Sequence, residues 1–265
     1  MASQKKAALV TGATRGIGYE LSKLFARDGY DLVINARHIE DLEEVAAEFE
    51  ASFGISVHPV ARDLSDPESP EAIFDDVQAE SLEISVLVNN AGFGLRGAFA
   101  ETDLETELRM MRVNMVALTH LTKLFLGGMV ERESGAILNV ASTAAYMPGP
   151  LMTVYYATKA FVLSFTEGLA SELEGSGVGV TALCPGPTKS HFKKRAKQRR
   201  IWMRYLLWEL EPERVAQAGF RAVKQGRRLA VSSLQDWLVI FFYRFVPRSL
   251  LAALVRELHK RREVD

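Results

Sequence analysis

The feature that most constrains the fold of this 265-residue chain is a regular alternation of short apolar runs with longer helical patterns. The apolar runs are rich in Val, Ile and Leu without alternating polar residues, which is typical of strands buried on both faces. A chain that alternates strand and helix forms right-handed crossovers and a parallel sheet covered by helices on both sides. The sequence therefore predicts an α/β fold with a doubly wound parallel sheet.

Seven apolar runs have the length of strands, so we expect a sheet of about seven strands. No stretch has the composition of a linker and no segment repeats, so residues 1–265 are expected to form a single domain. The expected strands are Ala7–Val10, Asp31–Asn35, Ser56–Ala61, Val86–Val88, Ala136–Val140, Val178–Leu183 and Arg228–Val231. The expected helices are Gly18–Arg27, Glu40–Phe53, Pro70–Glu80, Leu104–Val130, Val154–Glu174 and Pro212–Gln225.

Two segments interrupt the alternation and are interpreted as additions to this domain. The first, a substrate lid over about residues 187–211, is rich in cations. The second, a helical extension over about residues 234–262, is rich in apolar and aromatic residues, and Pro247 is expected to divide it in two. The cations of the lid are Lys189, Lys193, Lys194, Arg195, Lys197, Arg199, Arg200 and Arg204.

Composition limits the class of protein. A formal net charge of -1 gives no reason to expect a nucleic-acid partner. The single cysteine, Cys184, excludes an intrachain disulfide and suits a reducing cytoplasm, and the five histidines lack the spacing of metal ligands. The N-terminus has no secretory pattern, and the longest apolar run, Trp237–Tyr243, is far shorter than the roughly 20 residues of a membrane span. We expect a cytoplasmic protein with no metal site and no transmembrane segment.

A glycine-rich loop follows the first expected strand and opens into a helix, within the sequence Thr11-Gly12-Ala13-Thr14-Arg15-Gly16-Ile17-Gly18. Glycines allow a tight turn and a close approach of the backbone to a pyrophosphate, while the helix N-terminus offers free N–H groups to the phosphates. The loop therefore predicts a dinucleotide site. Its expected cofactor-binding residues are Gly12, Thr14, Arg15, Gly16, Ile17 and Gly18.

The end of the second expected strand indicates which dinucleotide binds. A site for NAD places an acidic residue there to bind the ribose hydroxyls, but this strand ends in Asn35-Ala36-Arg37. The guanidinium of Arg37, with that of Arg15, suits a 2′-phosphate, so we predict NADP (NADPH) in preference to NAD. The alternative is that both arginines are ordinary surface residues and that Glu40 or Asp41 binds the ribose of NAD.

In the motifs that it carries, the chain resembles the short-chain dehydrogenase/reductase family, in the subgroup with a TGxxxGxG loop. The resemblance spans residues 11 to about 190 and implies a Rossmann fold, a nicotinamide cofactor, and interconversion of a carbonyl and a secondary alcohol. Five family signatures occur in order, namely the glycine loop, Asp63-Leu64, Asn89-Asn90-Ala91-Gly92, Ser142 with Tyr155-x-x-x-Lys159, and Pro185-Gly186.

The chemistry of Tyr155 and Lys159 agrees with this reaction. Hydride transfer to a carbonyl leaves negative charge on the oxygen, which needs a proton donor. Tyrosine titrates near pKa 10, and a nearby ammonium lowers that value, so we expect Lys159 to lower the pKa of Tyr155. The two residues are four apart and share a helix face. Tyr156 is also on the face of Lys159, but the family pattern selects Tyr155.

The resemblance also assigns roles to the other motif residues. Ser142 would hold the substrate oxygen, and Asn114 would support a water that links to Lys159, so the expected catalytic residues are Asn114, Ser142, Tyr155 and Lys159. Tyr155 and Lys159 would also contact the cofactor, with Lys159 on the nicotinamide ribose. The remaining expected cofactor-binding residues are Asp63, Leu64, Asn90, Ala91, Gly92, Pro185, Gly186 and Thr188.

The substrate is less constrained. The extension resembles those of family members that act on hydrophobic substrates, so we expect an apolar, acyl- or steroid-like substrate. The lid cations either bind an anionic end of it or are solvated, and the extension either covers the pocket, pairs with another subunit or contacts a membrane peripherally. A homodimer or homotetramer is implied by the family. The alternative functions are an NAD-linked alcohol dehydrogenase and an NADP-binding regulatory or scaffold module.

Overall fold

The computed structural model describes residues 6–189 and 209–260. Within them lies one seven-stranded parallel sheet in the order β3-β2-β1-β4-β5-β6-β7, which confirms the predicted fold class. All seven expected strands are present, with ends that differ from the prediction by a few residues. The strands are β1 (Lys6–Thr11), β2 (Asp31–Ala36), β3 (Val57–Ala61), β4 (Glu83–Asn89), β5 (Gly135–Val140), β6 (Val178–Cys184) and β7 (Leu229–Val231).

The topology places a binding crevice at the centre of the sheet. β1 pairs in parallel with both β2 and β4, so the chain winds outward from β1 in opposite directions. Ligands of open α/β sheets bind beyond the carboxyl ends of the strands at such a switch point. The glycine loop follows β1 and residues 90–92 follow β4, so the topology brings these two predicted cofactor segments together.

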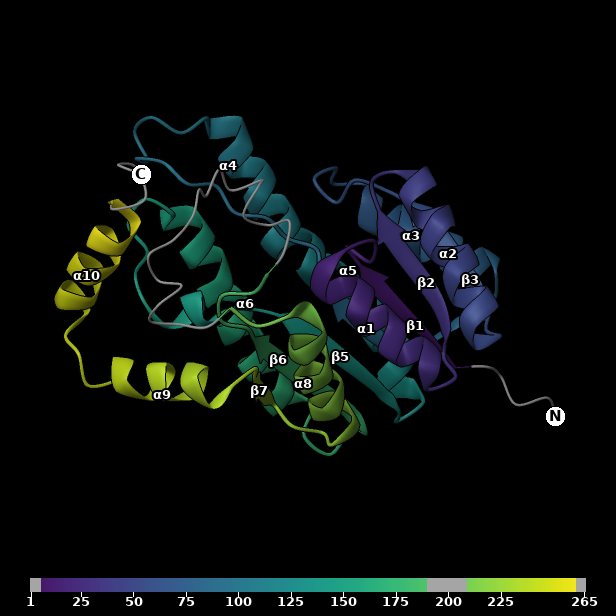
Figure 1. The fold of residues 1–265 in the computed structure, drawn as a ribbon. Helices are drawn as coiled ribbons and strands as arrows, with labels where there is room; N and C mark the ends of the chain where they lie inside the picture. The colour runs from purple at the N-terminus through teal and green to yellow at the C-terminus, as the bar shows by residue number, and fades with distance from the viewer. Residues whose placement is uncertain (1–5, 190–208, 261–265) are drawn as a thin grey trace.

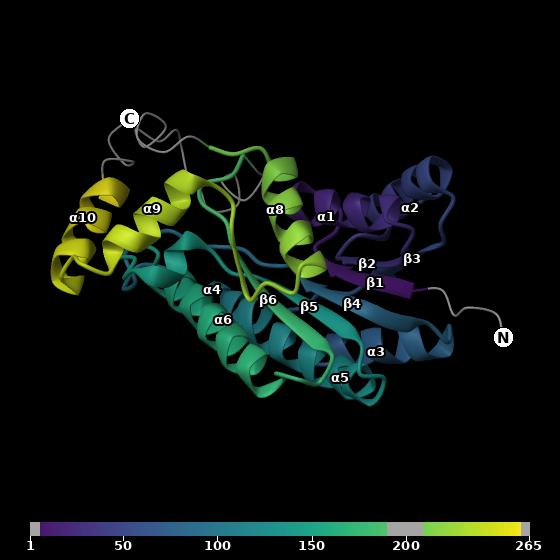
Figure 2. The ribbon, with the colours of Figure 1, turned by 90° about the horizontal axis from the view of Figure 1, so that it is seen from below.

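Helices cover both faces of the sheet (Figure 1). α1 (Gly16–Arg27), α2 (Ile39–Phe53) and α8 (Pro212–Lys224) pack on one face, and α3 (Ser69–Ala79), α5 (Leu118–Glu131) and α6 (Thr153–Glu172) on the other, as Figure 2 shows. The strands are apolar throughout because each contributes to both layers. Val10 packs in the core on the side of α1 and α8, whereas Leu9 packs in the core on the side of α3 and α5.

The helix expected at Leu104–Val130 is three consecutive elements. α4 (Leu104–Met111) passes into a π-helical segment, η1 (Arg112–Ala117), and then into α5. The prediction of one regular helix was wrong at η1, where a wider turn changes the phase of the side chains. Among the described residues this stretch, Leu104–Glu131, is the helix long and apolar enough to cross a membrane; here its α5 part packs Leu121 and Phe125 against the sheet.

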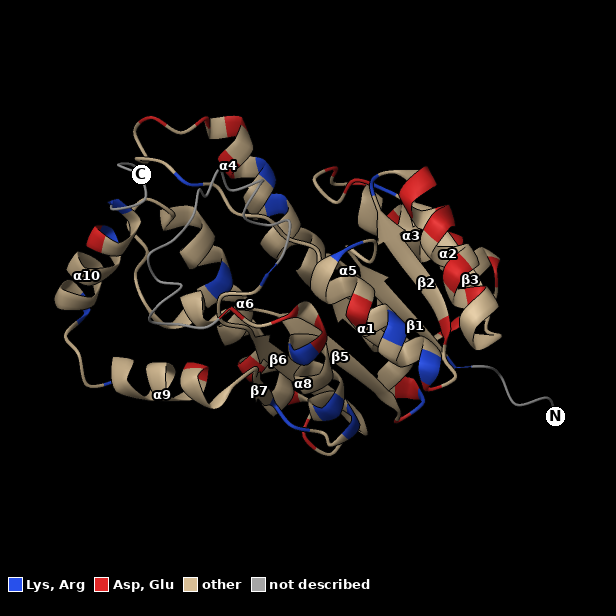
Figure 3. Cartoon of the chain, viewed as in Figure 1, with Lys and Arg blue, Asp and Glu red and all other residues tan. Residues whose placement is uncertain are grey.

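The C-terminal extension forms two helices, α9 (Leu234–Tyr243) and α10 (Arg248–Lys260), separated at Pro247 as expected. They lie beside α6 at one end of the molecule, and α9 carries few charges along its length (Figure 3). α9 packs against β7 and against η2 (Thr143–Tyr146), the short 3₁₀ helix that follows β5. The extension is therefore built onto the same end of the sheet as the predicted site.

The predicted lid lies mostly outside the described residues. Its two ends are described and lie side by side. Thr188 and Leu210 form a parallel bridge, in which the Lys189 amide donates to the Leu210 carbonyl at 3.0 Å. The side chains of Lys189 and Glu211 form an ion pair across the same junction. The described residues on the two sides of the segment are thus held together at one point.

Candidate active site

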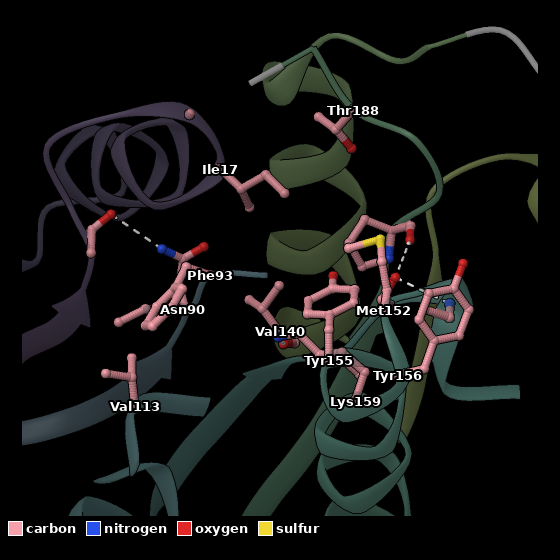
Figure 4. Close-up of a pocket in the computed structure, with 18 of the residues that line it drawn as sticks. Ile17, Asn90, Phe93, Val113, Val140, Met152, Tyr155, Tyr156, Lys159 and Thr188 are labelled. Carbon is pink, nitrogen blue, oxygen red and sulfur yellow. Dashed lines mark hydrogen bonds between the residues drawn. The ribbon is translucent and has the colours of Figure 1, made fainter. Parts of the chain in front are cut away.

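A cavity of about 550 Å³ opens at the carboxyl ends of the strands. It brings together segments from the first strand to the last helix, and Figure 4 shows part of its lining. Gly18 and Asn114 do not line it, and both are buried behind its wall. The other predicted site residues do line it: Gly12, Thr14, Arg15, Gly16, Ile17, Arg37, Asp63, Leu64, Asn90, Ala91, Gly92, Ser142, Tyr155, Lys159, Pro185, Gly186 and Thr188.

The glycine loop has the geometry of a phosphate-binding turn. Gly12 and Gly16 have φ values of 67° and 60°, in the left-handed region that side chains disfavour. The side chain of Arg15, the N-cap of α1, makes no hydrogen bond to the first helical turn. The N–H groups of that turn therefore face the cavity without a capping side chain, which suits them to bind an anion.

Gly18 has a packing role. A Cβ at this position would lie 2.2 Å from the Gly12 carbonyl oxygen and 2.4 Å from Nδ2 of Asn90. Only glycine therefore allows α1 to approach the loop this closely. The prediction that Gly18 binds the cofactor becomes a prediction that it shapes the loop that does.

Asn90 fastens the loop after β4 to the glycine loop. Its Nδ2 donates to the carbonyl oxygens of Thr11 at 2.9 Å and Gly12 at 3.1 Å. In return, Oγ1 of Thr11 accepts from the backbone amides of Asn90 and Ala91, both at 3.0 Å. These bonds fix the relative position of the two loops that border the crevice.

Charged side chains gather at the end of the cavity beyond β2. Burial raises the pKa of Asp63, but hydrogen bonds from Ser65 and the charges of Arg37 and Arg109 outweigh burial and hold that pKa below its ordinary value. Asp63 is thus an ionised acceptor suited to an adenine or ribose group. Arg15 pairs with Asp41 at 2.9 Å, and both border the cavity. Asp41, the acidic residue that would bind the ribose of NAD in the alternative interpretation, thus lies at the same end of the cavity as the two arginines.

Tyr155 and Lys159 lie together on α6 at the floor of the cavity (Figure 4). Burial raises the pKa of Tyr155 to about 12, while a hydrogen bond from Ser142 acts in the opposite direction. Burial also lowers the pKa of Lys159 to about 8, and its Nζ donates to the Val140 carbonyl at 2.7 Å. The expectation that Lys159 lowers the pKa of Tyr155 is corrected: burial dominates, and Tyr155 is a protonated phenol at neutral pH.

Ser142 stands at the end of β5, next to Tyr155. Its Oγ accepts from the Ala144 amide at 3.1 Å as the N-cap of η2, and lies 3.4 Å from the Pro185 carbonyl. The hydroxyl also bonds to Tyr155. This places two hydroxyl groups that can donate hydrogen bonds, those of Ser142 and Tyr155, at one point of the cavity, as a carbonyl oxygen that gains negative charge requires.

Asn114 supports these residues from behind. Its Oδ1 accepts from the Phe93 amide at 3.1 Å, and its Nδ2 donates to the Phe93 carbonyl and to Oγ1 of Thr158, both at 3.0 Å. A Cβ on Gly92 would lie 3.0 Å from Oδ1 of Asn114 and 3.6 Å from Nζ of Lys159. Asn114 therefore ties the loop after β4 to α6, close to Lys159.

Tyr156 also faces the cavity, but its side chain contacts the C-terminal helix α10. Its ring packs edge-on against His259 of α10, with centroids 5.7 Å apart, and its hydroxyl is 3.4 Å from Nε2 of His259. Nδ1 of His259 bonds to the Pro150 carbonyl at 2.6 Å, and Arg96 donates to the His259 carbonyl. Tyr156 thus anchors the C-terminal helix.

Sequence reasoning missed the apolar half of the lining. Met147 and Met152 come from the segment between β5 and α6, and Phe93 and Val113 from the opposite wall. The C-terminal helices α9 and α10 complete the wall. The extension therefore covers the pocket, which is one of the three roles expected for it from the sequence. Periodicity marked these helices as apolar but could not show which side faces the cavity. Their lining residues are Asp236, Val239, Tyr243, Val255, Leu258 and His259.

Comparison with known proteins decides the family. Residues 6–201 match the family described as short chain dehydrogenase. The chain belongs to this family.

Three proteins illustrate the similarity of this short-chain dehydrogenase to known members. The "Probable oxidoreductase EphD" of Mycobacterium tuberculosis is 33% identical over 256 residues, 91% of this chain and 43% of that protein. The very-long-chain 3-oxoacyl-CoA reductase of Anas platyrhynchos is 36% identical over 196 residues, 72% of this chain and 62% of the reductase. The chain thus spans less than two thirds of the length of these relatives.

The third is a solved structure of a short-chain dehydrogenase from Sphingobium yanoikuyae in complex with NADPH. It is 31% identical, with a TM-score of 0.81 over 91% of this chain and 93% of the other. The cradle of this short-chain dehydrogenase fits such a dinucleotide. A Cβ at Gly12 would lie 3.0 Å from Asn90 Nδ2 and 3.1 Å from Ala91 Cα, so the absence of a side chain at Gly12 lets the two loops that form the cradle pack closely.

Proposed function

We propose that this short-chain dehydrogenase uses NADPH to reduce a carbonyl group on a bulky apolar substrate. The observation that carries the cofactor preference is the pair of cations beyond β2. Arg15 and Arg37 border the same end of the cavity, and both are exposed there. Guanidinium groups bind phosphate through charge-assisted hydrogen bonds, so together they suit the 2′-phosphate of NADP.

The residues of the chain supply the acid chemistry, and the bound nicotinamide supplies the hydride. Tyr155, protonated because its pKa is about 12, donates its phenolic proton to the carbonyl oxygen as negative charge develops there. Ser142 hydrogen-bonds the same oxygen. Lys159 lies beside them with a pKa lowered to about 8, which allows it to return a proton to Tyr155 near neutral pH.

The lining of the cavity supports an apolar substrate. Around Tyr155 the wall is made of Phe93, Met147 and Met152, with Val255 and Leu258 contributed by α10. Such a surface offers dispersion contacts and desolvation but few polar partners, which favours acyl- or steroid-like carbonyl compounds over small polar ones. Methionines also adapt to substrates of irregular shape.

The experiment is a panel of uncharged ketones and acyl thioesters assayed with NADPH and with NADH. We expect reduction with NADPH, and a loss of at least about 100-fold in kcat for Tyr155→Phe, because the proton donor is removed. Tyr156→Phe is the matched control and should retain most of the activity. Full activity of Tyr155→Phe would disprove the mechanism, and equal use of thioesters and ketones would show that the lid cations do not recognise an anion.

One observation favours a second candidate, an NAD-linked alcohol dehydrogenase. Asp41 borders the cavity at 2.9 Å from Arg15, where its carboxylate could accept hydrogen bonds from the ribose hydroxyls. In that case Arg15 would be neutralised by Asp41. Tighter binding of NADH than of NADPH, with oxidation of secondary alcohols, would favour this candidate.

We further propose that the enzyme is a homodimer or homotetramer assembled through α4–α5 and α6. Support comes from apolar side chains on the outer surface of these helices: Phe161 is 39% exposed and stacks on Phe165, and Val116 is 53% exposed. Association of two copies through these helices would remove such apolar groups from water, which is favourable. Analytical ultracentrifugation of the wild type and of Phe161→Glu would test it; a monomeric wild type rules it out.

A further inference from the structure

A buried carboxylate of the C-terminal extension touches the cofactor loop. Asp236, in the first turn of α9, is 5% exposed and borders the cavity. A Cβ on Gly186 would lie only 1.9 Å from Oδ1 and 2.6 Å from Cγ of Asp236. The carboxylate therefore occupies the space beside Gly186, and the glycine is required for this contact.

The hydrogen bonds of Asp236 fix its orientation. Ser233 Oγ donates to Oδ2 at 2.8 Å and accepts from the Asp236 amide at 3.0 Å, so Ser233 both caps α9 and holds the carboxylate. The backbone N–H of Gly186 donates to the carboxylate as well. Burial raises the pKa of Asp236, and the bonds from Ser233 and Gly186 oppose that shift.

The opposite side of the same loop is held by the catalytic strand end. The Pro185 carbonyl accepts from the Thr143 amide at 2.9 Å and lies 3.4 Å from Oγ of Ser142. α9 also packs against η2, which begins at Thr143. The Pro185–Gly186 loop is thus held by hydrogen bonds on both sides, from the Ser142–Thr143 segment at Pro185 and to Asp236 at Gly186.

We propose that Asp236 is a positioning residue, whose carboxylate holds the backbone of Gly186 and thereby fixes the Pro185–Gly186 loop against the nicotinamide half of the cofactor. The inference rests on the proposed function for the placement of the nicotinamide at this loop. A buried carboxylate is costly unless its hydrogen bonds are satisfied, and an apolar side chain here would leave the Gly186 N–H without an acceptor. The extension would then act on cofactor binding as well as on the substrate.

The test separates the two halves of the cofactor. Fluorescence or calorimetric titration measures Kd for NADPH and NADH, and for 2′,5′-ADP and ADP, which carry only the adenine half. For Asp236→Ala we expect an affinity for the preferred dinucleotide about tenfold weaker, as for a lost hydrogen bond to a charged group, with the adenine fragments unchanged. Asp236→Asn keeps an acceptor for Gly186 and should restore dinucleotide affinity to within about twofold.

Two further variants keep the test decisive. Ile240→Ala weakens the packing of α9 through a buried residue that does not line the cavity, and should leave the ratio of dinucleotide to fragment affinity unchanged. Gly186→Ala should weaken dinucleotide binding in the wild type and much less in the Asp236→Ala background, because the colliding carboxylate is then absent.

The outcomes are distinguishable. Unchanged dinucleotide affinity in Asp236→Ala, or the same selective loss in Ile240→Ala, would overturn the role of the carboxylate while the proposed function stands. If losses in Gly186→Ala and Asp236→Ala simply add, the two residues do not act through one contact and the inference is likewise overturned. A wild type that binds neither dinucleotide would overturn the proposed function itself.

Discussion

At the scale of single residues, Arg37 and Asp41 make opposite demands on the cofactor. Arg37 is exposed at the end of β2, close enough to Asp63 to lower the pKa of that carboxyl, whereas Asp41 forms an ion pair with Arg15 at 2.9 Å. A 2′-phosphate would add negative charge beside Arg37 and repel Asp41. The cofactor preference therefore depends on the balance between the positive charge of Arg37 and the negative charge of Asp41.

Removing Arg37 tests this balance. We expect Arg37→Ala to raise Kd for NADPH about tenfold, because one charge-assisted hydrogen bond to phosphate is lost, and to leave Kd for NADH nearly unchanged. Arg27→Ala, an exposed arginine at the far end of α1, is the control and should alter neither. An unchanged ratio of the two Kd values in Arg37→Ala would remove the basis for NADP.

Lys159 makes a prediction about stability. Burial lowers its pKa from 10.5 to about 8, so between these values the unfolded chain binds more protons than the folded one. Stability therefore rises with pH in this window, relative to a variant without the amine. Without cofactor, the unfolding free energy of the wild type minus that of Lys159→Met should increase by about 2 kcal/mol between pH 8 and 9.5.

The measurement is urea unfolding at several pH values below 10, since the raised pKa of Tyr155 acts with the opposite sign above that pH. Loss of the bond from Lys159 to the Val140 carbonyl changes the difference in unfolding free energy by a constant amount. It does not change how that difference varies with pH. If the unfolding free energies of the two proteins change with pH in parallel, folding does not lower the pKa of Lys159 in this range.

At the scale of elements, sequence periodicity located every strand of the sheet, because a strand buried on both faces must be apolar along its whole length. It could not locate the π-helical segment η1, since the apolar residues of Leu104–Glu131 continue through it without a break. The family resemblance named Asn114, which the structure places behind the cavity wall and close to Lys159. The hydrogen bonds of Asn114 to Phe93 start from the π-helical segment η1, which the sequence pattern does not predict.

The bonds of Asn114 give this segment a measurable energy. Asn114→Leu removes the bonds to the half-buried N–H and C=O of Phe93 and the bond to Thr158, so we expect a loss of about 3 kcal/mol in unfolding free energy. Thr158→Val keeps both bonds to Phe93. It removes the bond between α6 and Asn114, together with the bond from Oγ1 of Thr158 to the Tyr155 carbonyl at 2.7 Å, and should cost about 1–2 kcal/mol. Chemical denaturation measures both; equal losses would mean that the bonds to Phe93 contribute little.

At the scale of the whole molecule, the cavity joins residues that lie far apart in the chain. The glycine loop forms one end of it, and α9 and α10 roof the other, more than 200 residues later. The order of motifs predicted the first end because each motif has a fixed chemical task. For the C-terminal extension, the sequence left three roles open: covering the pocket, pairing with another subunit and contacting a membrane. A helix that is apolar on more than one side does not reveal which side packs on the protein.

The roof makes the last prediction, which concerns the size of the substrate. Val239 faces the cavity from α9, whereas its neighbour Leu238 is 40% exposed and does not line it. Val239→Trp fills part of the pocket, so along a series of ketones of increasing size it should raise KM for the largest by about tenfold and leave the smallest unaffected. Leu238→Trp places the same indole side chain outside the cavity and should follow the wild type. If both variants treat the series alike, α9 does not bound the substrate, and its contribution to the site is the contact of Asp236 with the cofactor loop.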